Sequence, residues 1–215
     1  MAKLMERMLA RRPEERPKAS GVVKQLIALE ILGLPYTMVT GFPGTAQVNK
    51  AMLQNEVNFS GSSLPGYHTQ VIPQIINPGV GMPVFQFPAI GPDGMPVGDP
   101  TLERAGIATF DKVYAQAFGK PPASRKFDAL LLMNDISTKL QRIVVLPRGA
   151  PQDAVEALRA AFNALGHDKD FISDYMRVTG EEPDLVKAEL IEPLFQRMRH
   201  VDPEIVRILK ESVAE

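Results

Sequence analysis

The feature that most limits how this chain folds is the stretch Tyr36–Ser63, in which strand-like and helix-like patterns alternate. Turns that follow successive strands of an α/β protein meet at one edge of the sheet, where ligands bind. We therefore expect the two turns of this stretch to share a ligand-binding edge. The predicted order is strand, turn, helix, strand, turn, at Tyr36–Val39, Thr40–Thr45, Ala46–Leu53, Val57–Ser60 and Gly61–Ser63.

Both turns contain residue types that suit anion binding. Gly41 and Gly44 allow the backbone to adopt φ > 0 and to approach a ligand closely. Thr45 is the predicted N-cap of the following helix, whose first free N–H groups and dipole favour an anion. Ser62 and Ser63 add hydroxyls at the second turn. The residues alone thus indicate a carboxylate or phosphate site that needs no basic side chain.

Composition excludes several classes of function. With 24 Lys and Arg against 25 Asp and Glu, the net charge is −1, and no excess of charge argues for binding to nucleic acid or to an anionic membrane. No cysteine is present, so neither disulfides nor thiolate chemistry can operate. No apolar run reaches the length of a membrane span, and the N-terminus lacks the pattern of a secretion signal. A complete chain of this kind is expected in the cytoplasm.

The remaining pattern also alternates strands with helices, which predicts an α/β fold with a mostly parallel sheet and a helical C-terminal third. Ala89–Pro100, with its glycines and prolines, is predicted to be an exposed loop. Further strands are predicted at Met82–Phe87 and Gln141–Leu146. Helices are predicted at Met1–Leu9, Val22–Leu32, Pro65–Ile72, Thr101–Arg104, Phe110–Phe118, Phe127–Leu140, Asp153–Leu165, Asp170–Arg177, Leu185–Arg199 and Pro203–Val213.

Residues with catalytic or metal-binding potential are scattered. The three histidines lie far apart in sequence and have no carboxylate or cysteine at ligand spacing, which argues against a metal site. Ser62 and His68 suggest a hydrolase only weakly, because Ser62 lacks the Gly-x-Ser-x-Gly elbow. Asp135 and the basic pair Arg125 and Lys126 are expected to be solvated. We therefore assign no catalytic residue, no metal and no cofactor.

Two segments resemble a known family. Gly33–Ala46 (GLPYTMVTGFPGTA) and Leu53–Phe59 (LQNEVNF) resemble the second lobe of the receptors of tripartite tricarboxylate transporters, also called Bug proteins. In that family a Tyr-Lys-Gly-Gly-type turn and a helix lead to a Gly-Gly-x-Val-Asp-type strand. Val145–Leu158 (VLPRGAPQDAVEAL) resembles the family's Leu-x-Ala-Pro-x-Gly-Thr-Pro segment. The resemblance runs from about Gly21 to Val213.

The resemblance implies a periplasmic-binding-protein-like lobe and a periplasmic solute-binding receptor that delivers a small organic carboxylate to membrane transporter components. Apolar spacing and proline content predict an N-terminal amphipathic helix and linker at 1–20. The resemblance implies the ligand-binding lobe at 21–141 and a crossover strand with C-terminal helices at 142–215. The first-lobe strand, the secretion signal and the usual lysine of the first turn are missing, so the chain resembles the C-terminal portion of a receptor. The implied ligand-binding residues are Thr40, Gly41, Phe42, Gly44, Thr45, Ala46, Ser60, Ser62 and Ser63.

Two other functions stay open at this point: a small cytoplasmic α/β enzyme acting on an anionic substrate, and an interaction protein that has the fold without the ligand. An enzyme should place a titratable group beside the turns, and only Glu56 lies in this stretch, at the wrong end of its strand. A homodimer is also predicted, because without a first lobe the C-terminal helices lack part of their partner surface. The apolar positions concerned are Val155, Leu158, Phe162, Leu165 and the methionine-rich helix Met1–Leu9.

Overall fold

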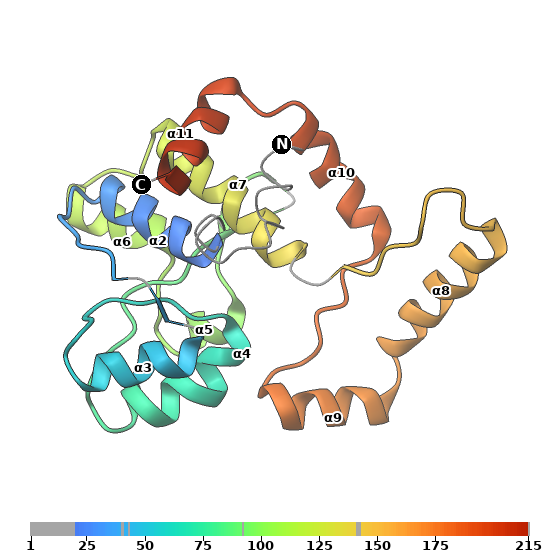
Figure 1. Cartoon of the computed structure of the whole chain (residues 1–215), viewed down its shortest axis with the longest axis horizontal. Helices are drawn as coiled ribbons and strands as arrows, with labels where there is room; N and C mark the ends of the chain where they lie inside the picture. The colour runs from blue at the N-terminus through green and yellow to red at the C-terminus, as the bar shows by residue number, and fades with distance from the viewer. Residues whose placement is uncertain (1–19, 40, 43, 92, 141–142, 215) are drawn as a thin grey trace. The chain divides into compact units, whose positions relative to one another are not determined.

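A computed structural model of the chain describes residues 20–39, 41–42, 44–91, 93–140 and 143–214. The predicted helix Met1–Leu9 lies outside the described residues. The chain divides into two compact units, each made of segments that are distant in sequence (Figure 1). Unit 1 comprises Met1–Val39, Pro83–Leu140 and Pro193–Glu215, and unit 2 comprises Thr40–Met82 and Gln141–Glu192. The bounds and roles predicted for the three domains stay a prediction.

Most described residues lie in helices, and the C-terminal third is helical as predicted. Each predicted helix within the described residues is present. The ends of most differ from the prediction by a few residues; α10, for example, begins three residues later than predicted. The helices are α2 (Ser20–Ile31), α3 (Thr45–Leu53), α4 (Leu64–Gly66), η2 (Tyr67–Ile76), α5 (Pro100–Arg104), α6 (Phe110–Phe118), α7 (Arg125–Lys139), α8 (Gln152–Leu165), α9 (Lys169–Thr179), α10 (Ala188–Arg199) and α11 (Pro203–Ala214).

Glycines end helices where the sequence indicates. After α2, Gly33 adopts φ +68° and donates its N–H to the carbonyl of Glu30, while the N–H of Leu34 bonds to the carbonyl of Leu29. After α6, Gly119 adopts φ +72°. This left-handed conformation costs glycine little and closes the helix by satisfying its last carbonyls.

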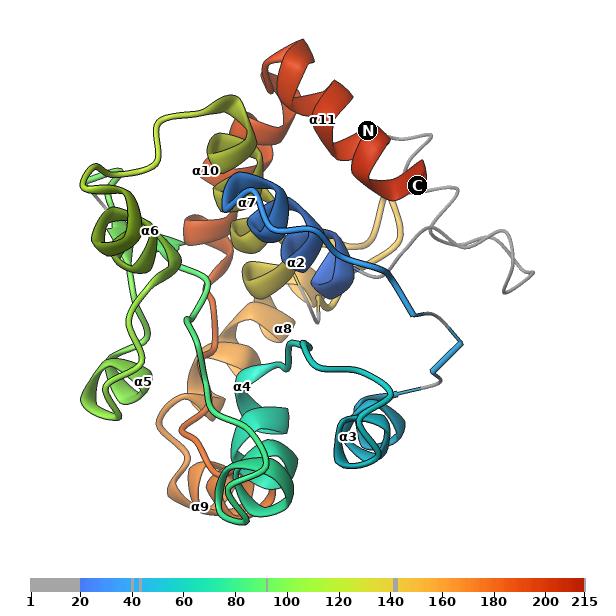
Figure 2. The ribbon, with the colours of Figure 1, turned by 90° about the vertical axis from the view of Figure 1, so that its left-hand side faces the viewer.

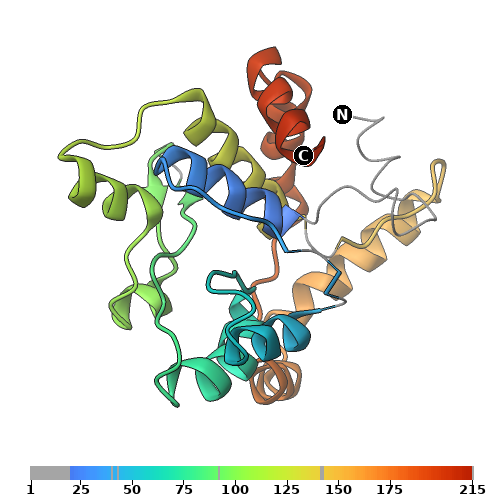
Figure 3. The ribbon, with the colours of Figure 1, turned by 60° about the vertical axis from the view of Figure 1, so that its left-hand side comes forward.

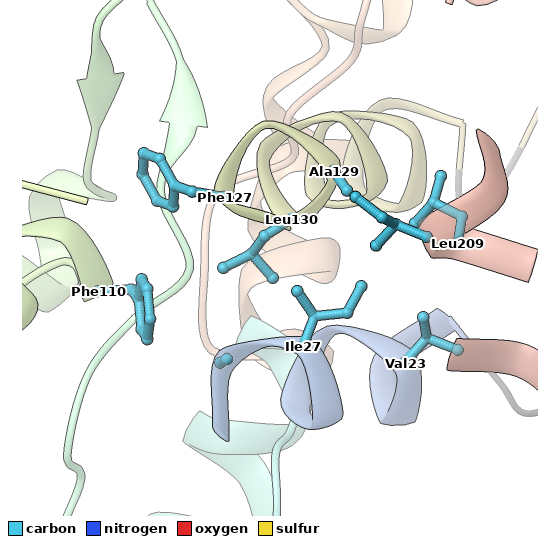
Figure 4. Packing of buried hydrophobic residues seen from close by; sticks show 9 residues of the cluster. Val23, Ile27, Phe110, Phe127, Ala129, Leu130 and Leu209 are labelled. Atoms are coloured by element: carbon cyan, nitrogen blue, oxygen red, sulfur yellow. The ribbon is translucent and has the colours of Figure 1, made fainter. Parts of the chain in front are cut away.

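The core of unit 1 lies between α2, α7 and α11, which pack together (Figure 3). Ile27 of α2 and Leu130 of α7 are fully buried and point toward one another between the two helices (Figure 4). Phe110 and Phe127 extend this cluster with rings 6.1 Å apart. Each such side chain contributes about 1.5–3 kcal/mol when it leaves water, so burial of this cluster stabilises unit 1.

The residues that the structure describes do not form the predicted parallel sheet. Their only sheet is an antiparallel hairpin of β1 (Ala89–Ile90) and β2 (Pro96–Val97), inside the stretch expected to be a loop. Of the predicted strands, Met82–Phe87 forms one isolated parallel bridge, from Gln86 to Thr109. The described residues of the other three, Tyr36–Val39, Val57–Ser60 and Gln141–Leu146, form no strand. A β-strand requires a neighbouring strand to pair with its backbone N–H and C=O groups, and no strand among the described residues lies beside these segments.

Unit 2 contains a pair of packed helices, α3 and η2. They lie side by side and are entered from the same end (Figures 1 and 2). Asn49 is buried between them and donates from Nδ2 to Oε1 of Gln74 at 3.1 Å. Ala51 and Ile75 are the buried apolar residues of the two helices.

Pro73 does not end its helix, contrary to the prediction. The helix continues to Ile76, and from Tyr67 onward it is a π-helix with Pro73 inside. A proline removes one N–H donor and crowds the carbonyl four residues earlier. The wider i to i+5 turn of a π-helix relieves that crowding, so the chain changes helix type and continues.

Candidate functional site

The first predicted turn leads into α3, whose N-cap residue is a glycine and therefore makes no side-chain capping hydrogen bond. Gly44 is the N-cap, and Thr45, predicted to be the cap, is the first helical residue. The carbonyl of Gly44 accepts from the N–H groups of Gln47 and Val48. The N–H groups of Thr45 and Ala46 donate to no residue that the structure describes. Two backbone donors therefore point out of the first turn of α3, where the helix dipole favours an anion.

Only one of the two turn glycines has the predicted conformation. Gly41 adopts φ +97°, as expected. Gly44 has φ −178° and ψ 177°, an extended backbone that any residue adopts, so the prediction of positive φ is wrong there. The nearest atom to a methyl group added at Gly44 is Oε1 of Gln47 at 3.5 Å, an ordinary contact. Phe42 is half-buried, and Thr40 lies outside the described residues.

The second predicted turn leads into the helix that begins as α4. Ser63 is its N-cap, and Oγ of Ser63 accepts the N–H of Gly66 at 3.3 Å. Its hydroxyl proton stays available for donation. Ser62 folds over Gly66, where an added Cβ would lie 2.5 Å from Oγ of Ser62. Both serines are exposed.

Ser60 is not brought to the start of α3. Its hydroxyl donates to Sδ of Met52 at 3.1 Å, in the last turn of that helix. Met52 is seven residues after Thr45, a rise of about 10 Å along the helix axis. The structure thus places Ser60 beside the C-terminal end of α3, away from the amides of Thr45 and Ala46.

His68 follows the second turn in sequence and lies in the first turn of η2. Nε2 is buried and finds no hydrogen-bond partner among the described residues. The side chain packs against Gly180, the left-handed residue that ends α9, where an added Cβ would lie 3.1 Å from Cβ of His68. The imidazole is therefore held as a packing element under α9.

A polar cluster in unit 1 corrects the prediction that Asp135 is solvated. Its side chain has no exposed surface; Nζ of Lys139 lies 2.9 Å from Oδ1, and Nη1 of Arg197 lies 3.0 Å from Oδ2. The spacing of four residues on α7 made the Lys139 contact predictable, whereas nothing in the local sequence indicated Arg197. Arg125 and Lys126 are exposed as predicted, although each also makes ion pairs, with Asp202 and Glu30 among their partners.

The neighbouring residue, Asn134, accepts a hydrogen bond from the amine of Lys24, a contact that the sequence did not indicate. Its Oδ1 accepts Nζ of Lys24 at 2.8 Å, and its Nδ2 donates to the carbonyl of Pro88 at 2.9 Å. Nζ of Lys24 also lies 5.1 Å from the centre of the Phe87 ring. Burial lowers the pKa of Lys24 from 10.5 to about 8. In the sequence, Lys24 is one lysine within an apolar helix. Its contacts with Asn134 and Phe87, which are distant in sequence, are known only from the folded chain.

Within the described residues, no group of three or more His, Cys, Asp and Glu side chains is arranged to hold a metal ion. None of the described helices has the length and apolar composition needed to cross a bilayer. Comparisons of the chain with protein-family models, with curated proteins and with solved structures find no match.

Proposed function

We propose that this chain is a solute-binding receptor, or a portion of one, for small carboxylates. The observation that supports this function best is the uncapped start of α3, where the N–H groups of Thr45 and Ala46 have no described partner. The α4–η2 helix enters from the same end of the pair (Figure 1) and adds the exposed hydroxyls of Ser62 and Ser63. The proposed ligand-binding residues are Gly41, Phe42, Gly44, Thr45, Ala46, Ser62 and Ser63, with Thr40 preceding them in the same turn.

The proposed binding uses backbone groups rather than side-chain charge. No Lys or Arg occurs in 40–46 or 60–66, so the attraction comes from N–H groups and the helix dipole. A ligand held on one side only remains in contact with water, and the expected affinity lies between about micromolar and millimolar, roughly −8 to −4 kcal/mol. In a receptor of this kind the ligand would pass to membrane transporter components outside the cytoplasm.

The periplasmic-binding-protein-like lobe belongs to the same proposal. We infer that extended segments such as 143–146 join a parallel sheet only when other strands supply hydrogen-bond partners. A first lobe, present elsewhere in a complete receptor, would provide such strands. This accounts for strand-like sequences that form no strand among the described residues.

The substitution Thr45→Pro tests the site by removing one proposed donor. Proline is favoured at the first position of a helix, and the extended backbone of Gly44 is compatible with a following proline. The helix should therefore survive while the amide is lost. Lys169→Pro is the matched control, because Lys169 is the first residue of α9, and its cap, Asp168, bonds to the next two amides instead.

The measurement is a titration with acetate and succinate, monitored by amide chemical shifts. We expect shifts at Gly41, Gly44, Thr45 and Ala46 in the unmodified chain, a loss of affinity of about tenfold or more in Thr45→Pro, and no change in Lys169→Pro. Absence of shifts at millimolar ligand, or shifts confined to other regions, would contradict the proposed site. Turnover of an added phosphorylated or carboxylated compound would instead favour the enzyme alternative.

Exposed apolar residues in unit 2 support a second, compatible proposal, a homodimer. On α8, Leu158 is 45% exposed and Phe162 39% exposed, and the helix has no buried residue. Val144 and Val145 are 68% and 74% exposed in an extended segment without a strand partner. Such surfaces are unusual on a monomer unless they bind a partner, and a two-fold axis buries the same surface on both copies.

A further inference from the structure

Lys24 differs from the other lysines whose contacts the structure describes, because its ammonium meets no carboxylate. Its partners are the amide oxygen of Asn134 at 2.8 Å and the face of the Phe87 ring at 5.1 Å. Lys112, Lys126 and Lys139 instead pair with Glu103, Glu30 and Asp135. Lys24 is half-buried, so part of the residue is in contact with solvent.

The acidic groups on the elements around α2 are already engaged. Asp135, next to Asn134 on α7, is held by Lys139 and Arg197. The acid of α2 itself, Glu30, pairs with Lys126. On α11, which also packs against α2, Arg207 pairs with Glu204 and Glu211, and Lys210 is exposed. No described carboxylate therefore stabilises the charged form of Lys24.

We propose that Lys24 is a site of covalent acylation, at which its amine attacks the carbonyl carbon of a small activated acyl donor of the acyl phosphate class. The carbon–nitrogen bond forms as the bond from carbon to the phosphate oxygen breaks. The phosphate leaves with the electron pair and takes up the proton that the amine loses. The product amide keeps one N–H, which can still donate to Oδ1 of Asn134, and it removes a charge from a partly desolvated position.

The amine at this position is unusually available for attack. Burial lowers the pKa of Lys24 to about 8, so a substantial fraction of the amine is neutral near pH 7.5. Lys112 provides the contrast, because its hydrogen bond to Glu103 and the charge of that carboxylate raise its pKa. Nucleophilicity falls as basicity falls, which offsets part of the gain, and an advantage of about tenfold in rate remains.

Acetyl phosphate is the probe, and initial acetylation rates are measured for each lysine by peptide mass spectrometry. At pH 7.5 we expect Lys24 to react about fivefold to tenfold faster than Lys112. Above about pH 9 the Lys24 rate should level off while the Lys112 rate keeps rising. In strong denaturant the preference should vanish. Equal rates in the folded chain, or parallel pH profiles, would overturn the proposal.

Asn134→Asp provides a second test, because it sets a carboxylate beside Nζ of Lys24. We expect the Lys24 rate at pH 7.5 to fall at least about fivefold while the Lys112 rate is unchanged. An unchanged Lys24 rate in a folded Asn134→Asp chain would contradict the role given to the missing carboxylate. If far-ultraviolet circular dichroism shows that this variant is unfolded, the pH profile of the unmodified chain decides the question.

Discussion

Removing the two cations around Asp135 is expected to destabilise unit 1 far more than replacing Asp135 itself. The side chain of Asp135 has no exposed surface, whereas those of Lys139 and Arg197 are 31% and 44% exposed. The double substitution Lys139→Met and Arg197→Met therefore leaves a carboxylate buried without a counter-charge. Stranding a buried charge in this way costs about 3–5 kcal/mol.

Asp135→Asn leaves the opposite situation, in which two cations lose their partner but can turn toward water. The asparagine keeps the shape of the side chain and removes the buried charge. The expected loss is about 1–2 kcal/mol, the net value of the lost charge-assisted contacts. Arg177→Met is the control, because its pair with Asp174 at 3.1 Å is over 70% exposed on both sides and should contribute about 0–1 kcal/mol.

Urea unfolding measured by circular dichroism gives the change in unfolding free energy for each variant. Hydrogen exchange of peptides from α7 and α11 shows whether the change is located in unit 1. If Asp135→Asn costs as much as the double substitution, or more, the asymmetry between a buried carboxylate and exposed cations is refuted.

Three further predictions follow from burial and exposure. The pKa of Lys24 is about 8 in the folded chain and 10.5 when unfolded, so the charged amine lowers the free energy of unfolding below about pH 8, and this penalty disappears as the pH rises toward 10.5. The free energy of unfolding should therefore rise by about 1–3 kcal/mol over this pH range, and Lys24→Met should lack this rise. An identical pH profile in Lys24→Met would contradict the prediction. Ile27→Ala should cost about 2–5 kcal/mol in urea unfolding, against less than about 1 kcal/mol for Met95→Ala at a position that is 61% exposed, and similar losses would contradict the assigned core. Sedimentation at micromolar concentration should show a dimer that Val145→Lys dissociates; a folded monomer before substitution would disprove the proposed interface.

The candidate site was predictable only in part, and the reason lies in which contacts are local. Local sequence indicates a turn followed by a helix, and it correctly indicated positive φ at Gly41. It could not indicate that Gly44, rather than Thr45, caps α3, because both residue types occur at caps and the backbone entry decides between them. It also could not place Ser60, whose hydrogen bond to Met52 depends on how the connection after α3 turns back along the helix.

The sequence by itself determined the helices of this protein, because apolar spacing, capping residues and terminal glycines act within a few residues of one another. Gly33 and Gly119 close their helices for that reason. Only the tertiary structure decided the rest. Apolar segments such as 143–146 remain unpaired, since a strand depends on a distant neighbour for its hydrogen bonds. Likewise, Asp135 is buried because Arg197, 62 residues away in sequence, reaches it in the fold.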